Sequence, residues 1–169
     1  VMGVPWGTLV VIVGILMFYL FVQGGAARWR TPLVLPFRAW SYQYPVGVLT
    51  AGFAHAGVGH LTGNLLGTVV FGSLAEYALG HFPRKRGSAT FSSVRTHPVT
   101  RITCFIGGTI IVGVLTGLFS LGPVIGFSGV VFAYAGFALV QRPVLTLVVV
   151  VGGGVINLVY RSLQRPTIQ

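Results

Sequence analysis

His55-Ala-Gly-Val-Gly-His60-Leu-Thr-Gly-Asn64 opens a long apolar stretch of this chain, and Gly126-Phe-Ser128-Gly129 lies at the edge of another. On a helix, His60 and Asn64 are four residues apart, so their side chains lie on one face, about one turn from each other. Polar side chains in apolar surroundings cost free energy unless they have a partner or a function. The two stretches therefore predict one site, built from His60, Asn64 and Ser128.

The composition is that of a membrane protein. Of the 169 residues, 54% are hydrophobic and 7% are charged, whereas soluble domains carry about 25% charged residues. The net charge of +10 comes from 11 Lys and Arg against one acidic residue, Glu76. The basic residues lie in the connections between apolar runs, as in membrane proteins, and not in a polar stripe that would bind nucleic acid. We therefore expect an integral, multi-pass membrane protein in a lipid bilayer, with no nucleic-acid partner.

Five apolar runs are long enough to cross a bilayer. They cover about 6–22, 61–79, 102–121, 124–140 and 144–160. Between them, the 23–50 connection mixes basic and aromatic residues, as segments at the membrane–water interface do, and the 81–100 connection is polar and basic. The sequence predicts an all-α, polytopic helical bundle that forms a single domain over 1–169.

The second and fourth runs begin on the same side of the membrane, because they are separated by an even number of crossings. Asn64 and Ser128 each fall about four residues into their run, or about 6 Å deep at 1.5 Å per residue. Glu76 lies about 24 Å further along the helix than His60. Depth therefore groups His60 and Asn64 with Ser128 and separates Glu76 from them. We expect a structural role for Glu76, with an Arg of the 81–100 connection as a candidate partner.

The residue types exclude several kinds of catalytic site. Aspartyl proteases need two carboxylates that share a proton, and this chain has only one acidic residue. His55 and His60 are five residues apart, which turns them about 140° from each other on a helix. No third ligand lies near them, so we expect no metal and no cofactor. A serine nucleophile remains; Ser128 would need a His as its base and hydrogen-bond donors for the oxyanion.

These motifs resemble those of the rhomboid intramembrane serine proteases. The resemblance is carried by H-x-x-x-x-H-x-x-x-N from His55 to Asn64, by G-x-S-G from Gly126 to Gly129 and by Leu74-Ala-Glu76-Tyr-Ala-Leu-Gly80. It is carried more loosely by Trp29-Arg30 in the first connection, and it covers essentially the whole chain.

The resemblance implies that Ser128 is the nucleophile and that His60, Asn64 and the Ser128 backbone amide form the oxyanion hole. It also implies a supporting role for His55 and a structural one for Glu76. Gly126 and Gly129 would permit close approach of the substrate backbone and of neighbouring helices.

The chain departs from the rhomboid pattern in one respect. Rhomboids take their catalytic His from a sixth span, and no sixth apolar run is present here. His81 and His97 are no substitutes, because both belong to the 81–100 connection on the far side of the membrane. The chain starts at Val1 instead of Met, and we expect it to be part of a longer protein in which a sixth span supplies that His.

Three functions compete. The leading hypothesis is an intramembrane serine endopeptidase that cleaves single-span membrane proteins near the point where they enter the membrane, by a Ser–His dyad. The alternative is a catalytically inactive rhomboid-like protein that binds membrane proteins. A transporter ranks below both, since transporters carry internal repeats and midplane polar sites, whereas this chain shows no repeat. The location that we expect is the plasma membrane of a prokaryote.

Overall fold

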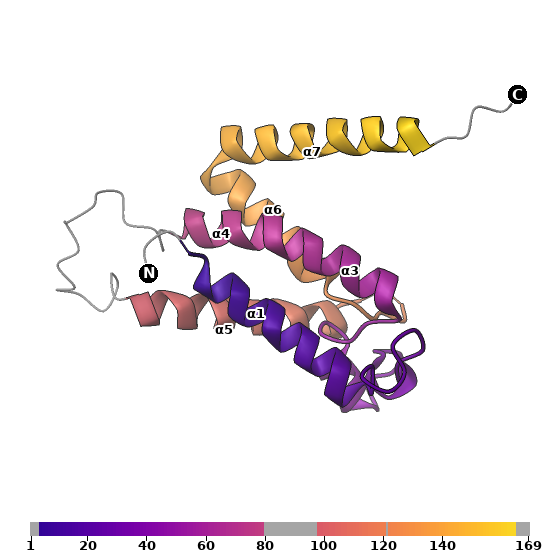
Figure 1. The fold of residues 1–169 in the computed structure, drawn as a ribbon. Coiled ribbons are helices and arrows are strands. Elements are labelled where there is room, and N and C mark those ends of the chain that lie inside the picture. Colours follow the sequence, from indigo (N-terminus) through magenta and orange to yellow (C-terminus); the bar gives the residue numbers. More distant parts are fainter. Residues whose placement is uncertain (1–3, 80–97, 121, 165–169) are drawn as a thin grey trace, which may run out of the picture.

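The computed structural model describes residues 4–79, 98–120 and 122–164. These residues form helices joined by loops, with one isolated β-bridge between Ala39 and Val124. Figure 1 shows the ribbon. In chain order the elements are α1 (Trp6–Met17), η1 (Phe18–Val22), η2 (Leu35–Phe37), α2 (Pro45–Thr50), α3 (Val58–Gly67), η3 (Thr68–Gly72), α4 (Ser73–Ala78), α5 (Pro98–Leu118), α6 (Ser128–Gln141) and α7 (Pro143–Gln164). Two of them are π-helical turns: η1 continues α1, and η3 joins α3 to α4.

Among the described residues, three helical segments are long and apolar enough to cross a membrane. These are Val58–Ala78, in which α3, η3 and α4 form one rod, Pro98–Leu118 and Pro143–Leu163. Trp6–Val22 and Ser128–Gln141 are apolar but shorter. The lengths and composition indicate a multi-pass membrane protein, as the sequence predicted, although three of the five expected spans reach full length in the described part of the chain.

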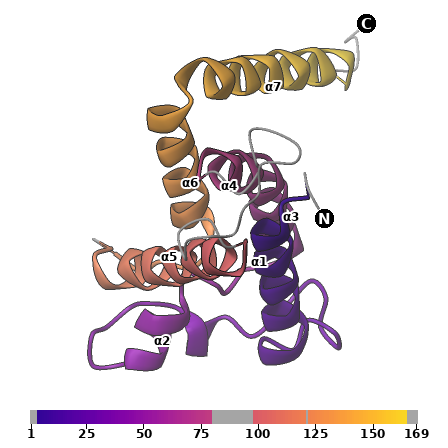
Figure 2. The ribbon, with the colours of Figure 1, turned by 90° about the vertical axis from the view of Figure 1, so that its left-hand side faces the viewer.

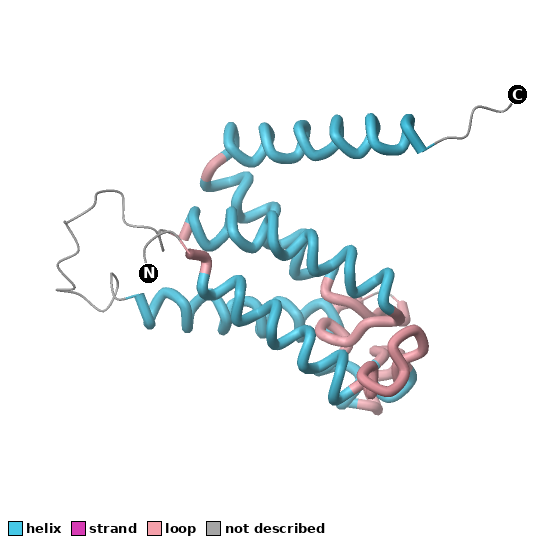
Figure 3. The backbone as a smooth tube through the Cα atoms, viewed as in Figure 1, coloured by secondary structure: helices cyan, strands magenta, loops and turns pink. Residues whose placement is uncertain are grey.

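The core lies where α1, the α3–α4 rod, α5 and α6 meet. Its buried side chains come from these helices, from η1 and from the residue just before α6, and they are Val11, Ile15, Tyr19, Leu61, Ala75, Phe105, Phe127, Val130 and Tyr134. Figure 3 shows that the loops gather at one end of these helices. This end carries the first connection and the loop before α6, and it is where the polar motifs meet.

Glycines allow the helices to approach closely. A Cβ on Gly67 would lie 2.7 Å from Val131 Cγ1, and one on Gly113 would lie 2.6 Å from the Phe53 ring. The spacing of small residues on membrane helices predicts such contacts. Gly63, one turn before Gly67, has open space where a Cβ would lie, so it makes no such close contact among the described residues.

The fourth expected span begins later than the sequence indicated. Val124 exchanges two backbone hydrogen bonds of 3.0 Å with Ala39, and the Gly126 amide donates to the Ala51 carbonyl at 2.8 Å. These contacts keep the residues before Ser128 in an extended loop, so α6 starts at Ser128 and has 14 residues. Ser128 is therefore the first residue of its helix and does not lie four residues inside it. The depth estimate for Ser128 was wrong in that respect.

Helix α7 departs from the expected bundle. Figure 2 shows it crossing the end of α6 and lying apart from α1 and α5. It packs chiefly against α6, and most of its side chains are exposed, although Thr146 is buried. The predicted span 144–160 is thus present as a long apolar helix, but outside the packed core.

Candidate active site

The His60 side chain packs against the backbone of Gly126. A Cβ on Gly126 would lie 2.6 Å from His60 Nε2 and closer still to Cε1, and Gly126 has a φ of +125°. That backbone conformation strongly favours glycine. Because Gly126 lies two residues before Ser128, this contact brings the H-x-x-x-x-H-x-x-x-N and G-x-S-G motifs together.

Ser128 lies at the N-terminus of α6 and is half-buried. The first backbone amides of a helix have no intrahelical acceptor, and the helix dipole places partial positive charge there. Both effects suit the stabilisation of an oxyanion beside the Ser128 hydroxyl. The position of Ser128 at the helix start, which the sequence did not indicate, therefore favours the predicted chemistry.

Asn64 lies one turn beyond His60 on α3 and is 7% exposed. Its Nδ2 is buried and has no hydrogen-bond partner among the described residues. Its carbonyl oxygen accepts a bond of 2.7 Å from Thr68 Oγ1, which ties it to η3. Buried donors are nearly always satisfied, so an orphaned amide on the His60 face is a donor available to a ligand.

His55 is completely buried, and its ring packs against the ring of His60. The two ring centroids lie 5.4 Å apart, and the Tyr19 ring lies 6.5 Å from His55. Both ring nitrogens of His55 lack a hydrogen-bond partner in the described part of the chain. Burial, together with the neighbouring His60, lowers the pKa of His55 to about 4. The imidazole is therefore neutral at pH 7 and lies against the His60 ring as an uncharged group.

Gln23 fixes the loop that carries His55, and the sequence analysis missed it. The His55 amide donates to Gln23 Oε1 at 2.8 Å, while Gln23 Nε2 donates to the carbonyls of His55 at 2.9 Å and Leu33 at 2.8 Å. Gln23 is fully buried at the end of η1. The available signal was a lone amide directly after an uncharged apolar run. Since the partners are 10 and 32 residues away, the sequence did not reveal them.

The Trp29-Arg30 pair lies against the same region. The Tyr19 hydroxyl donates to the Trp29 carbonyl, and the two rings meet edge to face with centroids 5.6 Å apart. Tyr19 thus links the first connection to the His55 side of the site.

Glu76 lies away from the site and binds the start of α1. Its carboxylate accepts hydrogen bonds from the Gly7 amide at 2.8 Å, the Thr8 amide at 2.7 Å and the Thr8 hydroxyl at 2.8 Å. A carboxylate at a helix N-terminus accepts hydrogen bonds from amides that have no intrahelical acceptor, and its negative charge is attracted to the positive end of the helix dipole. These three donors belong to α1. Most of the 81–100 connection, which the sequence offered as the source of a partner, lies outside the described residues.

Gly129 lies where α6 meets α5. A Cβ there would lie 2.6 Å from Thr116 Oγ1. The two glycines of the G-x-S-G motif therefore have different surroundings: Gly126 accommodates His60, and Gly129 accommodates α5.

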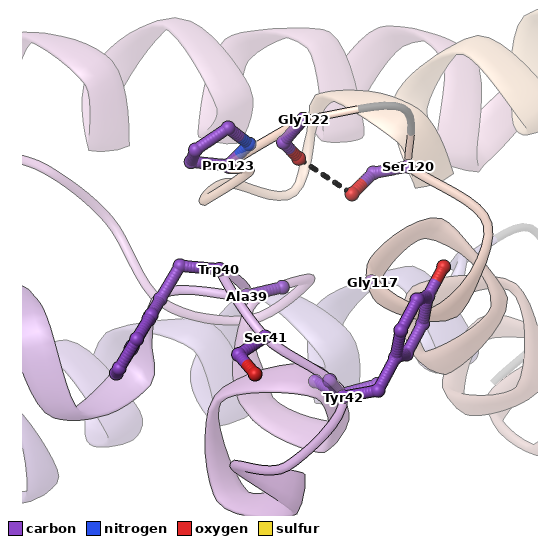
Figure 4. A pocket seen from close by; sticks show the side chains of 9 residues that line it. Ala39, Trp40, Ser41, Tyr42, Gly117, Ser120, Gly122 and Pro123 are labelled. Atoms are coloured by element: carbon purple, nitrogen blue, oxygen red, sulfur yellow. Dashed lines mark hydrogen bonds between the residues drawn. The ribbon is translucent and has the colours of Figure 1, made fainter.

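A cavity of about 200 Å³ lies beside the loop that leads to Ser128. Figure 4 shows it between the first connection, with Trp40 and Tyr42, and the segment that carries Ser120 and Pro123. The Ser120 hydroxyl donates to the Gly122 carbonyl at 2.7 Å, which shapes one wall. The exposed aromatic side chains give this cavity apolar surface outside the helices.

No group of three potential metal ligands occurs among the residues that the structure describes. Those residues include His55 and His60, while His81 and His97 lie outside them. No hydrogen bond links either described histidine ring to the Ser128 hydroxyl.

Comparison with known proteins gives one result. A family model described as the rhomboid domain matches residues 42–160. No significant match is found among curated proteins or solved structures. The matched region covers more than half of the chain and includes both motifs, and this chain belongs to the rhomboid family, a family of intramembrane serine proteases.

Proposed function

We propose that this protein is an intramembrane serine endopeptidase in which Ser128 attacks the scissile carbonyl. The observation that supports the proposal is the packing of the His60 ring of α3 on Gly126, two residues before Ser128. His60, Asn64 and the Ser128 amide would donate hydrogen bonds to the oxyanion of the tetrahedral intermediate. The serine would form an acyl-enzyme that water then hydrolyses.

The base is the part of the mechanism that the described residues do not supply. A serine hydroxyl is a weak nucleophile until a base takes its proton. We assign that role to a histidine on a further span, as in the rhomboid pattern, because Glu76 is engaged with α1 and lies at the other end of its helix.

The substrates that we propose are single-span membrane proteins, cut near the point where they enter the bilayer. The cavity beside Trp40 and Tyr42 lies next to the loop that precedes Ser128. It offers apolar surface to a substrate segment that has emerged from its own helix.

Cleavage of single-span reporter proteins in liposomes tests the proposal. The full-length protein is expected to cut a reporter near its membrane boundary, and Ser128→Ala is expected to abolish the cut. Ser162→Ala is the matched control, because Ser162 is exposed on α7, away from both the motifs and the cavity, and its hydroxyl donates to the Leu158 carbonyl one turn back. Loss of cleavage in Ser162→Ala alone, or equal cleavage by Ser128→Ala, would contradict the assignment.

A second candidate is an inactive rhomboid-like protein that binds membrane proteins. It is favoured by the absence of a hydrogen bond between Ser128 and either described histidine. Catalytic hydrogen bonds are often long before substrate binds, so the protease remains our proposal. Reporter binding without cleavage and without acylation of Ser128 would favour the second candidate.

A further inference from the structure

The first connection, residues 23–50, carries basic side chains that find no acidic partner among the described residues. Arg28 and Arg30 are exposed, and Arg38 is half-buried. None of the three side chains makes an ion pair or a hydrogen bond within the described part of the chain. The one acidic residue of the sequence, Glu76, binds the start of α1, at the other end of the helices. An anion that compensates these arginines therefore has to come from outside these 169 residues.

Two neighbouring aromatic residues of η1 hold both basic segments in one place. The Tyr19 ring meets the Trp29 ring edge to face, with centroids 5.6 Å apart, and both chain neighbours of Trp29 are arginines. The Phe18 ring meets the Phe37 ring in the same way at 5.5 Å, and Phe37 directly precedes Arg38. All three arginines therefore belong to segments that lie against the end of the first apolar helix.

This place is the boundary between the apolar helices and the polar loops. Figure 3 shows the loops gathered at one end of the helices. Phe21, near the end of η1, is 66% exposed, and Leu35 in the connection is 75% exposed. Exposed apolar side chains next to arginines match the boundary of a bilayer, where acyl chains meet phosphate groups. A soluble anion offers no apolar half to this match.

We propose that the surface formed by Arg28, Trp29, Arg30, Leu35 and Arg38 binds an anionic phospholipid at the edge of the bilayer. The guanidinium groups face the phosphate and the negative headgroup, and the exposed apolar side chains face the acyl chains. Basic residues beside a membrane attract anionic lipids in this way, over a range set by the Debye length. The inference does not depend on proteolytic activity.

Quenching of tryptophan fluorescence by brominated lipids tests the proposal with the full chain in vesicles. Trp29 and Trp40 lie in the first connection, and Trp6→Phe removes the tryptophan at the start of α1. Phosphatidylglycerol that carries bromine on its acyl chains, mixed with unlabelled phosphatidylcholine, is expected to quench more strongly than the mixture with the labels reversed. Arg28→Gln combined with Arg30→Gln is expected to reduce the preference for phosphatidylglycerol about fivefold or more, since each basic residue near the surface contributes roughly 1 kcal/mol.

Two further variants control for the charge and for its location. Arg28→Lys combined with Arg30→Lys keeps both charges, so it is expected to keep the preference. Arg161→Gln removes one charge from the exposed end of α7, outside the proposed surface, and is expected to leave the preference unchanged. High salt is expected to weaken the preference of the wild type, because it shortens the Debye length.

Three results would overturn the proposal; variants are compared only where their thermal unfolding midpoints show them to be folded. The first, which needs no substitution of an arginine, is equal quenching by the two brominated lipids. The second is an unchanged preference in the Arg→Gln pair, or an equal loss in the Arg→Gln and Arg→Lys pairs. The third is a preference that inorganic phosphate abolishes at constant ionic strength, which would show that the arginines bind a free anion.

Discussion

Substitution of Gly126 by Ala perturbs the contact on which the candidate active site depends. Gly126 has a φ of +125°, and its added Cβ would lie 2.6 Å from His60 Nε2. Forcing a non-glycine residue into such a conformation costs about 1–3 kcal/mol. The imidazole must also move aside, and a misplacement of about 1 Å in a catalytic group can lower the rate about 100-fold.

We therefore expect Gly126→Ala to lower the free energy of unfolding by about 1–3 kcal/mol. We also expect it to slow acylation of Ser128 by a fluorophosphonate probe about 100-fold. Gly122→Ala is the control, because it lies in the same loop and its Cβ would meet open space. It is expected to leave both quantities near their wild-type values.

A double-mutant cycle separates the steric clash from the backbone strain. In a His60→Ala background the ring is absent, so Gly126→Ala should retain the strain and lose the clash. The difference between backgrounds is expected to be about 0.5–3 kcal/mol, the usual range for residues in contact. An identical cost in both backgrounds, or wild-type acylation by Gly126→Ala, would refute the packing of His60 on Gly126.

Three further predictions concern the groups that support the site. Glu76→Gln should destabilise the protein by about 3 kcal/mol, because hydrogen bonds to charged groups contribute more than neutral ones and Glu76 accepts three of them; a denaturant titration with unchanged stability would contradict this. Gln23→Leu should cost about 3 kcal/mol and slow acylation, since the buried His55 amide loses its acceptor; the exposed Gln43→Leu in the same connection is the control. The lowered pKa of His55, about 4 against an ordinary 6.5, means that the unfolded chain binds this proton more readily than the folded one. Protonation of this group therefore leaves the free energy of unfolding unchanged above pH 6.5 and lowers it by up to about 3 kcal/mol as the pH falls toward 4. His55→Phe should remove this part of the pH dependence of thermal unfolding.

The parts of the fold that were predictable from the sequence rest on local patterns. Long uncharged runs predicted the membrane helices, and the spacing of His60 and Asn64 placed them on one face of α3. The separation of Glu76 from the site followed from helical rise alone. Each of these inferences needs only the geometry of a single helix.

The parts that were not predictable rest on contacts between distant residues. Val124 belongs to an apolar run that could continue α6, but its hydrogen bonds to Ala39 hold it in a loop. From the sequence, Gln23 appears only as the residue after the first apolar run. Its hydrogen bonds to His55 join residues that are 32 positions apart, and a local pattern does not predict them. The position of α7 outside the core is likewise decided by packing and not by its apolar composition.

The most direct test of the central claim is the site and rate of acylation by a fluorophosphonate in the full-length protein, followed by peptide mass spectrometry. We expect a single adduct on Ser128, with a rate that falls about 100-fold or more in His60→Ala and in Asn64→Ala, as for the loss of an oxyanion donor. An adduct on another serine, or acylation of Ser128 that is unaffected by both substitutions, would show that His60, Asn64 and Ser128 do not form one catalytic site.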